Sequence, residues 1–409
     1  MKLLASILIL LFTTTLACAA NWPQWRGPDG TGIGAESDFP VEWSATENVV
    51  WKLPLPGPGN STPIIWNDRV FITQSLDKGA RRAVLCIDRK DAKILWQKEI
   101  AFADTEPTHG DNPYCSASPA TDGEIVVAWH GSAGMVAYDF TGKELWHTDL
   151  GAFTHIWGNA SSPVIYGDNV IAYCGPGLSA FIAAFDKKTG KEVWRIPLPD
   201  AQSKTPKDFY GAWNCPVIRT FNGKTEMLVG LPKSLVAYDL ATQKPIWTCG
   251  GLGPLVYNNP LYSGEYVVCM SGYSGPTMCV RDGGMGDVTE THRLWRHEAK
   301  LPQRVGSGVI SGDYLYILNE PGTAECLEVK TGKTVWKNPV ATSSWGSMAL
   351  CGEKLYVIDM KGTCHVLKAS PEFAELGKNP MGELTRASPA FSNGQIFIRT
   401  YQNLYCIGK

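Results

Sequence analysis

The sequence predicts an all-β fold, an eight-bladed β-propeller whose blades are four-stranded antiparallel sheets. Three observations lead to this prediction. The 409 residues include 42 glycines and 27 prolines, and 11% of them are aromatic, which is typical of many short strands joined by tight turns. A hairpin motif ending in tryptophan recurs along the chain. A small residue that opens a strand, usually next to proline, recurs at the same interval of about 45 residues.

The first twenty residues, 1–20, are predicted to be a signal peptide. Lys2 precedes an apolar run from Leu3 to Phe12, and small residues follow as far as Ala20. This order is typical of secretory signals, and the run is too short to cross a bilayer. Cys18 leaves a second interpretation open, a lipid-modified N-terminus. We therefore expect an exported protein, periplasmic or extracellular, with a possible lipid anchor at Cys18 and no transmembrane segment.

Residues 21–47 carry no repeat and are predicted to form an N-terminal extended segment before a propeller that covers 48–409. Within the propeller, hairpins of the form A-x-D-x-x-T-G-K-x-x-W recur. A single hairpin cannot bury both of its faces, so the copies must stack against one another. The tryptophans that end them, which we expect to pack between blades, are Trp96, Trp146, Trp194, Trp247, Trp295 and Trp336.

The strand-opening motif gives the number of blades. Its copies begin near Ser61, Ser118, Ser162, Cys215, Asn259, Ser307, Ser347 and Ser388. The eighth unit has only three strands before Lys409, but residues 48–53 supply a fourth, because Trp51 stands where the other units carry their terminal tryptophan. We expect this N-terminal strand to pair with the C-terminal blade, which closes the ring and leaves no open seam.

Two other residue types recur, and plain structural roles account for them. Cys86 and Cys326 occupy a slot that other copies fill with alanine, where a small buried side chain is needed. One or two disulfides among the remaining cysteines stay possible, since an exported destination permits them. The aspartates that we expect to bond to the backbone of their tight turns are Asp88, Asp139, Asp186, Asp239 and Asp282.

The hairpins resemble the repeats of pyrroloquinoline-quinone (PQQ) type eight-bladed propellers over roughly residues 48–409, and the start at Trp22-Pro-Gln-Trp25 resembles secreted bacterial propellers of this kind. One branch of that family, the quinoprotein dehydrogenases, binds PQQ and calcium and oxidises alcohols or sugars. The other is similar to the lipoprotein that assists outer-membrane β-barrel assembly, a non-catalytic protein-binding propeller.

The sequence departs from the dehydrogenase branch. No two of its twelve cysteines are adjacent, no C-x-x-C-H haem motif occurs, and no set of acidic and amide residues stands out as a calcium site. His109, Asp111, His155 and His365 lack metal-ligand spacing, so no metal site and no catalytic residue are assigned. No cofactor is expected, and PQQ with calcium remains possible but unsupported by motifs.

Large side chains break the repeat just before the opening strands. In a propeller these connections surround one mouth of the central channel, where aromatic and arginine side chains suit a ligand or a protein hot spot. They could equally do no more than fill the funnel. The candidate binding residues are Trp157, Trp213, Asn214, Tyr257, Asn258, Arg304, Trp345 and Arg386.

Composition narrows the function classes further. With 37 basic and 39 acidic residues the net charge is −2, which excludes a polycationic nucleic-acid binder. We expect an exported, non-catalytic binding or scaffold propeller, a monomer that recognises a protein partner in the cell envelope or a small polar ligand at the mouth. The alternatives are a PQQ-dependent oxidoreductase and a subunit of a larger envelope assembly. The sequence leaves open whether the protein is an enzyme and favours that it is not.

Overall fold

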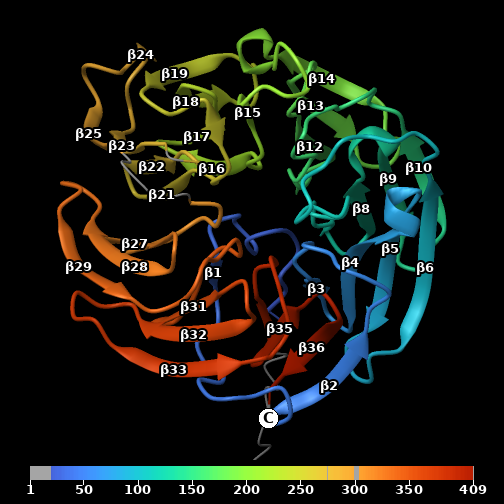
Figure 1. Cartoon of the computed structure of the whole chain (residues 1–409). Coiled ribbons are helices and arrows are strands. Elements are labelled where there is room, and N and C mark those ends of the chain that lie inside the picture. The colour runs from blue at the N-terminus through green and yellow to red at the C-terminus, as the bar shows by residue number, and fades with distance from the viewer. Residues whose placement is uncertain (1–19, 274, 299–303, 409) are drawn as a thin grey trace, which may run out of the picture.

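A computed structural model describes residues 20–273, 275–298 and 304–408. Eight four-stranded blades surround one central opening (Figure 1), which confirms the predicted eight-bladed propeller. The predicted signal peptide, residues 1–20, lies almost entirely outside the described residues, as does Cys18. No helix of the described ranges is both long and apolar enough to cross a membrane.

The blades follow one another along the chain. Blade 1 consists of β3 (Ile64–Trp66), β4 (Arg69–Leu76), β5 (Arg81–Asp88) and β6 (Ile94–Ala101), and blade 2 of β7 (Ala120–Thr121), β8 (Ile125–Trp129), β9 (Met135–Asp139) and β10 (Glu144–Thr148). Blade 3 consists of β11 (Val164–Tyr166), β12 (Asn169–Cys174), β13 (Phe181–Asp186) and β14 (Glu192–Pro197), and blade 4 of β16 (Val217–Phe221), β17 (Lys224–Leu231), β18 (Ser234–Asp239) and β19 (Pro245–Gly250). Blade 5 consists of β21 (Leu261–Ser263), β22 (Tyr266–Met270), β23 (Thr277–Arg281) and β25 (Arg293–His297), and blade 6 of β26 (Val309–Ser311), β27 (Tyr314–Asn319), β28 (Thr323–Glu328) and β29 (Thr334–Pro339). Blade 7 consists of β30 (Ala349–Cys351), β31 (Lys354–Ile358), β32 (Thr363–Lys368) and β33 (Glu375–Pro380), and blade 8 of β34 (Ala390–Ser392), β35 (Gln395–Arg399), β36 (Asn403–Ile407) and β2 (Val49–Pro54).

A few short elements supplement the blades. They are β1 (Ile33–Gly34) on the edge of β30, β24 (Gly286–Asp287) on the edge of β19, the pair β15 (Gly211–Ala212) and β20 (Leu255–Val256), and the 3₁₀ turns η1 (Asp77–Gly79), η2 (Gly131–Ala133) and η3 (Pro199–Ala201).

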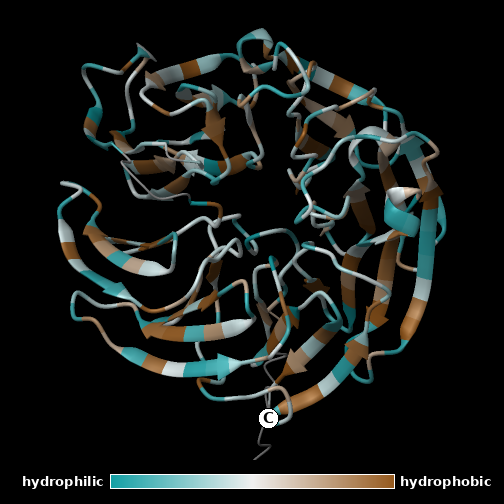
Figure 2. Cartoon of the chain, in the orientation of Figure 1, coloured by the Kyte–Doolittle hydropathy of each residue, from teal (hydrophilic) through white to brown (hydrophobic). Residues whose placement is uncertain are grey.

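The hydrophobic core lies between neighbouring blades. All five residues of β8 and all five of β36 are buried, because both faces of these strands pack against other sheets. Along the outer strands, hydrophobic and hydrophilic residues are mixed (Figure 2). The central strands therefore pack against neighbouring blades on both faces, and this packing joins each blade to the next around the ring.

The terminal tryptophans seal the seams between blades, as predicted. The indole N–H of Trp96 donates to the backbone carbonyl of Phe140 in the next blade at 3.1 Å, and that of Trp146 donates to Lys187 at 2.8 Å. Trp51, Trp295 and Trp336 make the equivalent bond. Each of these rings thus combines burial of a large apolar surface with one satisfied polar group.

A closed ring of eight hydrogen bonds joins the blade openings. In each blade the residue before the inner strand donates its backbone N–H to the side chain of the equivalent residue in the next blade, at 2.8 to 3.3 Å. The last donor, Ser388, bonds to Thr62 of the first blade and completes the circle. In chain order the members are Thr62, Ser118, Ser162, Cys215, Asn259, Ser307, Ser347 and Ser388.

The N-terminal strand closes the propeller. β2 pairs in antiparallel register with β36, with Trp51 opposite Cys406 and Leu53 opposite Leu404. Figure 1 shows β2 alongside β36, at the two ends of the colour bar. The predicted closure between the first strand and the last blade is confirmed.

Residues 20–34 cross the central opening (Figure 1). Trp22 pairs with Ile65 of blade 1, and β1 pairs in parallel with β30 of blade 7. Between them, Arg26 donates to the carbonyl oxygens of Thr31 at 2.5 Å and Gly308 at 2.6 Å. Its complete burial lowers its pKa to about 9. This segment therefore connects blade 1 with blades 6 and 7.

Cysteine and aspartate roles are partly as predicted. All eleven cysteines of the described residues are buried free thiols, so none of the possible disulfides forms among them. Asp139 accepts turn N–H groups from Thr141 and Lys143, as expected. For Asp282 the turn interpretation is incomplete, because its carboxylate also contacts Arg219 and accepts the indole N–H of Trp247.

Candidate functional site: the cavity at the mouth

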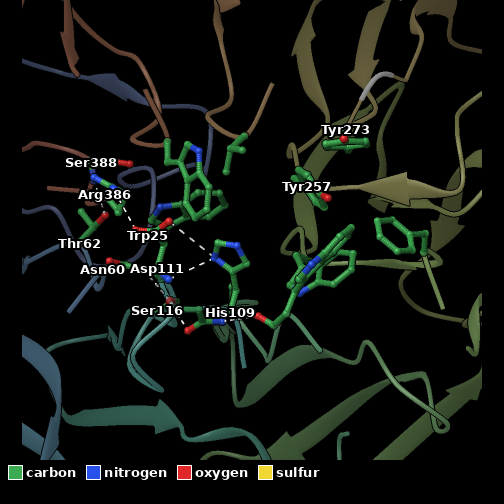
Figure 3. A pocket seen from close by; sticks show the side chains of 17 residues that line it. Trp25, Asn60, Thr62, His109, Asp111, Ser116, Tyr257, Tyr273, Arg386 and Ser388 are labelled. Carbon is green, nitrogen blue, oxygen red and sulfur yellow. Dashed lines mark hydrogen bonds and ion pairs between the residues drawn. The ribbon is translucent and has the colours of Figure 1, made fainter. Parts of the chain in front are cut away.

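A cavity of about 480 Å³ opens at the mouth of the central channel (Figure 3). Its lining comes from the connections that precede the inner strands, from the loop before blade 2, and from Trp25 of the N-terminal segment. Thr62 and Ser388, two members of the hydrogen-bonded ring, also line it. The volume is in the range typical of small-molecule sites.

Aromatic rings form one wall of the cavity. Trp157 lies 5.6 Å from Trp213 and 5.0 Å from Phe209, and Trp213 lies 5.2 Å from Tyr257, measured between ring centroids. Tyr273 also lines this side, next to Tyr257 in Figure 3. The indole N–H of Trp213 donates to the carbonyl of Gly158 at 2.8 Å, which fixes the ring. Phe209 and Tyr273 are about half-exposed at the rim.

Polar side chains form the opposite wall. The guanidinium of Arg386 donates to the carboxylate of Asp111 at 2.9 Å. His109 lies 3.7 Å from the same carboxylate and 5.7 Å, between ring centroids, from Trp345. Asn60 donates to the backbone carbonyl of Asp111 at 2.6 Å. Figure 3 shows these residues on the side opposite Tyr257 and Tyr273.

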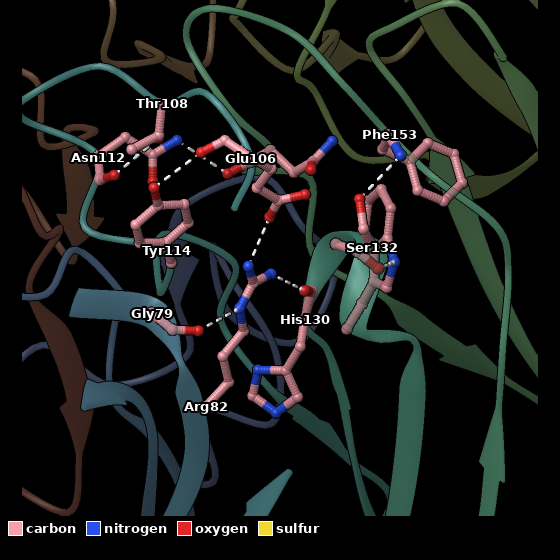
Figure 4. Close-up of polar contacts among 12 residues, drawn as sticks. Gly79, Arg82, Glu106, Thr108, Asn112, Tyr114, His130, Ser132 and Phe153 are labelled. Atoms are coloured by element: carbon pink, nitrogen blue, oxygen red, sulfur yellow. Dashed lines mark hydrogen bonds and ion pairs between the residues drawn. The ribbon is translucent and has the colours of Figure 1, made fainter. Parts of the chain in front are cut away.

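A buried ion pair positions the loop that carries His109 and Asp111. In the connection between blades 1 and 2, Glu106 accepts from the guanidinium of Arg82 at 2.6 Å, and both side chains are at most one-tenth exposed. The Tyr114 hydroxyl donates to the backbone carbonyl of Glu106 at 2.8 Å (Figure 4). Breaking a buried pair leaves an uncompensated charge, so this anchor holds the polar wall in place.

A second anchor ties the same loop to the aromatic wall. The side-chain amide of Asn112 donates to the backbone carbonyl of Trp157 at 2.8 Å and to that of Asn159 at 3.0 Å. The two walls of the cavity are therefore linked by direct hydrogen bonds. A ligand that binds between the two walls therefore has little ordering cost to overcome in the protein.

Five of the eight residues predicted for the mouth line the cavity, namely Trp157, Trp213, Tyr257, Trp345 and Arg386. The other three do not, because their side chains hold the scaffold together. Asn214 bonds to both backbone groups of Gly230, and Asn258 donates to the carbonyl of Gly306. Arg304 donates to Asn319 and Thr277.

Sequence reasoning missed several lining residues. Phe209 and Tyr273 lie in loops with no counterpart in the other units, so comparison of the repeats could not point to them. Trp25 precedes the repeats altogether. Asn60 stands three residues before Pro63, the same position as Trp213, but it was not among the candidate binding residues.

The donor set does not fit a metal or PQQ. Within the described residues no three histidine, cysteine, aspartate or glutamate side chains converge on a point that could hold an ion. PQQ is a tricarboxylate and calls for several cationic partners. Among the described lining residues, Arg386 carries the positive charge, and it is already paired with Asp111. These residues give the cofactor neither a calcium cage nor free guanidinium groups.

A family model described as outer membrane protein assembly factor BamB matches residues 36–181 and 178–408. The BamB of Burkholderia pseudomallei, named an outer membrane protein assembly factor, is 23% identical over 415 residues, covering 96% of this chain and 97% of the relative.

Solved structures show the same fold. BamB from Moraxella catarrhalis superimposes with a TM-score of 0.61 at 16% identity, over 88% of this chain and 97% of that one. The quinohemoprotein alcohol dehydrogenase of Comamonas testosteroni gives 0.67 at 12% identity, over 95% and 80%. At such identities the likeness concerns the fold alone.

Proposed function

This chain belongs to the family of the outer membrane protein assembly factor BamB, and on that basis we propose that it is an exported, non-catalytic propeller that binds a protein partner in the cell envelope. The observation that carries the proposal is the extent of the family match, which runs from residue 36 to residue 408 and so includes all eight blades. The relative from Burkholderia pseudomallei aligns over nearly its whole length as well.

We place the binding surface at the mouth. Its aromatic residues and its arginine are the residue types that dominate protein hot spots. Phe209 and Tyr273 stand about half-exposed at the rim. The closed ring holds these loops in fixed relative positions, which lowers the ordering cost of binding.

Localisation is part of the proposal. Residues 1–20 direct export to the periplasm, with cleavage near Ala19 or Ala20, and lipid attachment at Cys18 is the alternative. The mature protein acts as a monomer. Mass spectrometry of the intact protein purified from its native host checks where the signal is cleaved, because cleavage near Ala20 gives an unmodified N-terminus. A mass that includes diacylglycerol on Cys18 would establish the alternative instead.

Partner capture from native envelopes tests the binding surface. The change is Phe209→Ser together with Tyr273→Ser, and we expect at least a tenfold loss of co-purified partner, because the exposed apolar rim is removed. Tyr166→Ser is the matched control, since Tyr166 is also exposed but lies on β11 away from the cavity. Near-ultraviolet circular dichroism verifies the fold. Undiminished capture by the folded double variant would place the surface elsewhere.

The alternative function, a PQQ-dependent oxidoreductase, requires that the protein binds PQQ, whereas our proposal does not. We expect no stoichiometric complex when PQQ and calcium are added to the purified protein, because the lining provides no acidic cage and its guanidinium is already paired. Titration followed by the absorbance of the quinone, with dye reduction as a second readout, measures this. A calcium-dependent complex of one quinone per chain would favour the dehydrogenase interpretation.

A further inference from the structure

The start of the described chain is bonded directly to the blades. The backbone N–H of Ala20 donates to Oδ1 of Asn393 at 3.0 Å. Two residues further on, Trp22 exchanges two backbone hydrogen bonds with Ile65 of blade 1, at 2.9 and 2.8 Å. Within the described residues, the attachment to the blades therefore begins at the nitrogen of Ala20.

This attachment lies on the face opposite the mouth. Asn393 stands in the turn between β34 and β35, the inner hairpin of blade 8. Ser388, which lines the mouth cavity, precedes β34. Because β34 runs from one to the other, Asn393 lies at the end of the inner strand that is remote from the cavity. The nitrogen of Ala20 is therefore separated from the mouth by the length of that strand.

The surroundings of the Ala20 nitrogen suit an ammonium group. The backbone N–H of Asn393 donates to the carboxylate of Glu36 at 2.6 Å, so the amide acceptor and the carboxylate meet at one residue. Arg89 borders the same turn, and its guanidinium donates to the backbone oxygen of Ser392 at 2.6 Å. An ammonium has three donors where a backbone amide has one, and its hydrogen bonds are strengthened by its charge. A free amino group at Ala20 would therefore be held more firmly than a peptide N–H.

The sequence supplies a processing motif at the same point. Secretory signals are cut after small residues that stand one and three positions before the bond. The stretch Ala17-Cys18-Ala19 provides both small residues for the bond between Ala19 and Ala20. A cut one bond later, before Asn21, would remove Ala20 and with it the hydrogen bond to Asn393. The motif and the structure therefore select the same bond.

We propose that the exported chain is cut between Ala19 and Ala20, and that Asn393 and Glu36 receive the amino group which this cut creates. The peptidase of the export machinery hydrolyses the peptide bond with one water molecule. Ala19 leaves with the new carboxylate, and Ala20 keeps the nitrogen as an ammonium. That nitrogen is the atom bonded to Asn393. The inference rests on the export that the proposed function includes, and it adds a site on the face opposite the mouth.

Substitutions in the full-length precursor test which bond is cut. Pulse-labelling in the native host gives the rate of processing, and mass spectrometry identifies the first residue of the mature chain. We expect a start at Ala20. Ala17→Gln should accumulate as precursor, because a large side chain then stands three positions before the cut. Ala20→Gln is the matched control and should be processed at the wild-type rate, because residue 20 follows the cut. A start at Asn21 or at a lipid-modified Cys18, or a block by Ala20→Gln, would overturn the proposal.

Labelling of the amino group tests the receiving site. Acetic anhydride is added to the purified mature protein, and mass spectrometry follows acetylation of the α-amino group, with surface lysines as the internal standard. Asn393→Ala should react about tenfold faster than the wild type, because the amino group loses its acceptor. Asn393→Asp keeps that acceptor and should react slowly. Asn222→Ala is the control, since Asn222 has a φ of 48° in the inner turn of blade 4 and Asn393 has a φ of 47°. Equal rates in the wild type and Asn393→Ala would refute the receiving site.

The two proposals fail in different ways. Asn393→Ala should capture the partner as well as the wild type does, because Asn393 is remote from the mouth. A mature chain that starts at Asn21 and still captures its partner would overturn this inference alone. A chain that starts at Ala20, with capture undiminished when Phe209 and Tyr273 are replaced, would overturn the proposed binding surface alone.

Discussion

Arg219 lies at the seam between blades 4 and 5, enclosed by two carboxylates. Its guanidinium donates to Glu226 at 2.6 Å and contacts Asp282, and all three side chains are at most 4% exposed. Asp282 also accepts the indole N–H of Trp247 at 2.7 Å. The sequence indicated only a turn aspartate at position 282, because its partner stands 63 residues away on another blade.

Replacing Arg219 by methionine should destabilise the fold strongly. The change leaves two buried carboxylates without a counter-charge, and breaking such a pair costs about 3–5 kcal/mol. Chemical denaturation followed by tryptophan fluorescence measures the free energy of unfolding. Arg195→Met is the control, because Arg195 pairs with Glu192 at the exposed surface, where such pairs contribute about 0–1 kcal/mol. Equal effects of the two changes would show that the cluster at the seam adds nothing.

His365 should make stability depend on pH. Burial alone lowers its pKa, but the carboxylates of Asp359, 3.8 Å away, and Glu375, 3.0 Å away, outweigh burial and raise it. A raised folded-state pKa means that the imidazolium stabilises the fold fully below the unfolded pKa of about 6.5. That contribution is lost as the pH rises through the folded-state value.

The measurement for His365 compares the wild type with His365→Gln. We expect the wild type to exceed the variant in unfolding free energy by more at pH 5.5 than at pH 8.5. Denaturation curves in the two buffers give the difference. A gap that is constant with pH, or larger at pH 8.5, would contradict the proposed charge state.

Among the elements, the blade openings were predictable from the sequence in their number but not in their hydrogen bonding. The small residue before each inner strand was visible in the repeat, and it gave the correct number of blades. Its role was not visible, because each side chain accepts its hydrogen bond from the preceding blade. Only the closed arrangement of the blades brings donor and acceptor together.

Substitutions in this ring should have graded effects. Asn259→Ala removes the acceptor for the buried backbone N–H of Cys215, which is bonded at 2.8 Å, and should cost about 1–3 kcal/mol. Cys215→Ser keeps an acceptor of similar size for Ser162 and should be nearly neutral. Thermal unfolding of the two variants checks this. A Cys215→Ser variant as unstable as Asn259→Ala would mean that packing, rather than the hydrogen bond, is decisive.

The loop before blade 2 is the element that sequence reasoning could not place. The sequence presents His109 and Asp111 only as possible metal ligands, for which their spacing is wrong. Their place in the cavity depends on the buried contact between Arg82 and Glu106. That contact joins a strand of blade 1 to a loop without repeat, so no periodic pattern reveals it.

At the scale of the whole molecule, ring closure was predictable and the crossing segment was not. A blade short of one strand, together with a spare strand ending in the expected tryptophan, required β2 to pair with β36. Residues 20–34 have no such pattern. Arg26 binds backbone carbonyls of blade 6, and carbonyl groups carry no sequence signature.

Loss of Trp51 should destabilise the fold more than loss of Trp194. Trp51 is buried and donates to Arg89 of blade 1, so Trp51→Ala should cost about 3–5 kcal/mol. Trp194 is only partly buried, and Trp194→Ala should cost less. Calorimetry of both variants provides the comparison, and a smaller effect at Trp51 would contradict closure as a stabilising contact.

Site-specific photo-crosslinking in intact cells of the native host tests the central claim, that the mouth is the surface where a partner binds. A photoreactive phenylalanine replaces Tyr273 at the rim of the cavity or, as the control, Tyr166 on β11. We predict a discrete cross-linked envelope protein with the probe at position 273 and none at position 166. Equal cross-linking at both positions, or a partner captured only at position 166, would contradict the account.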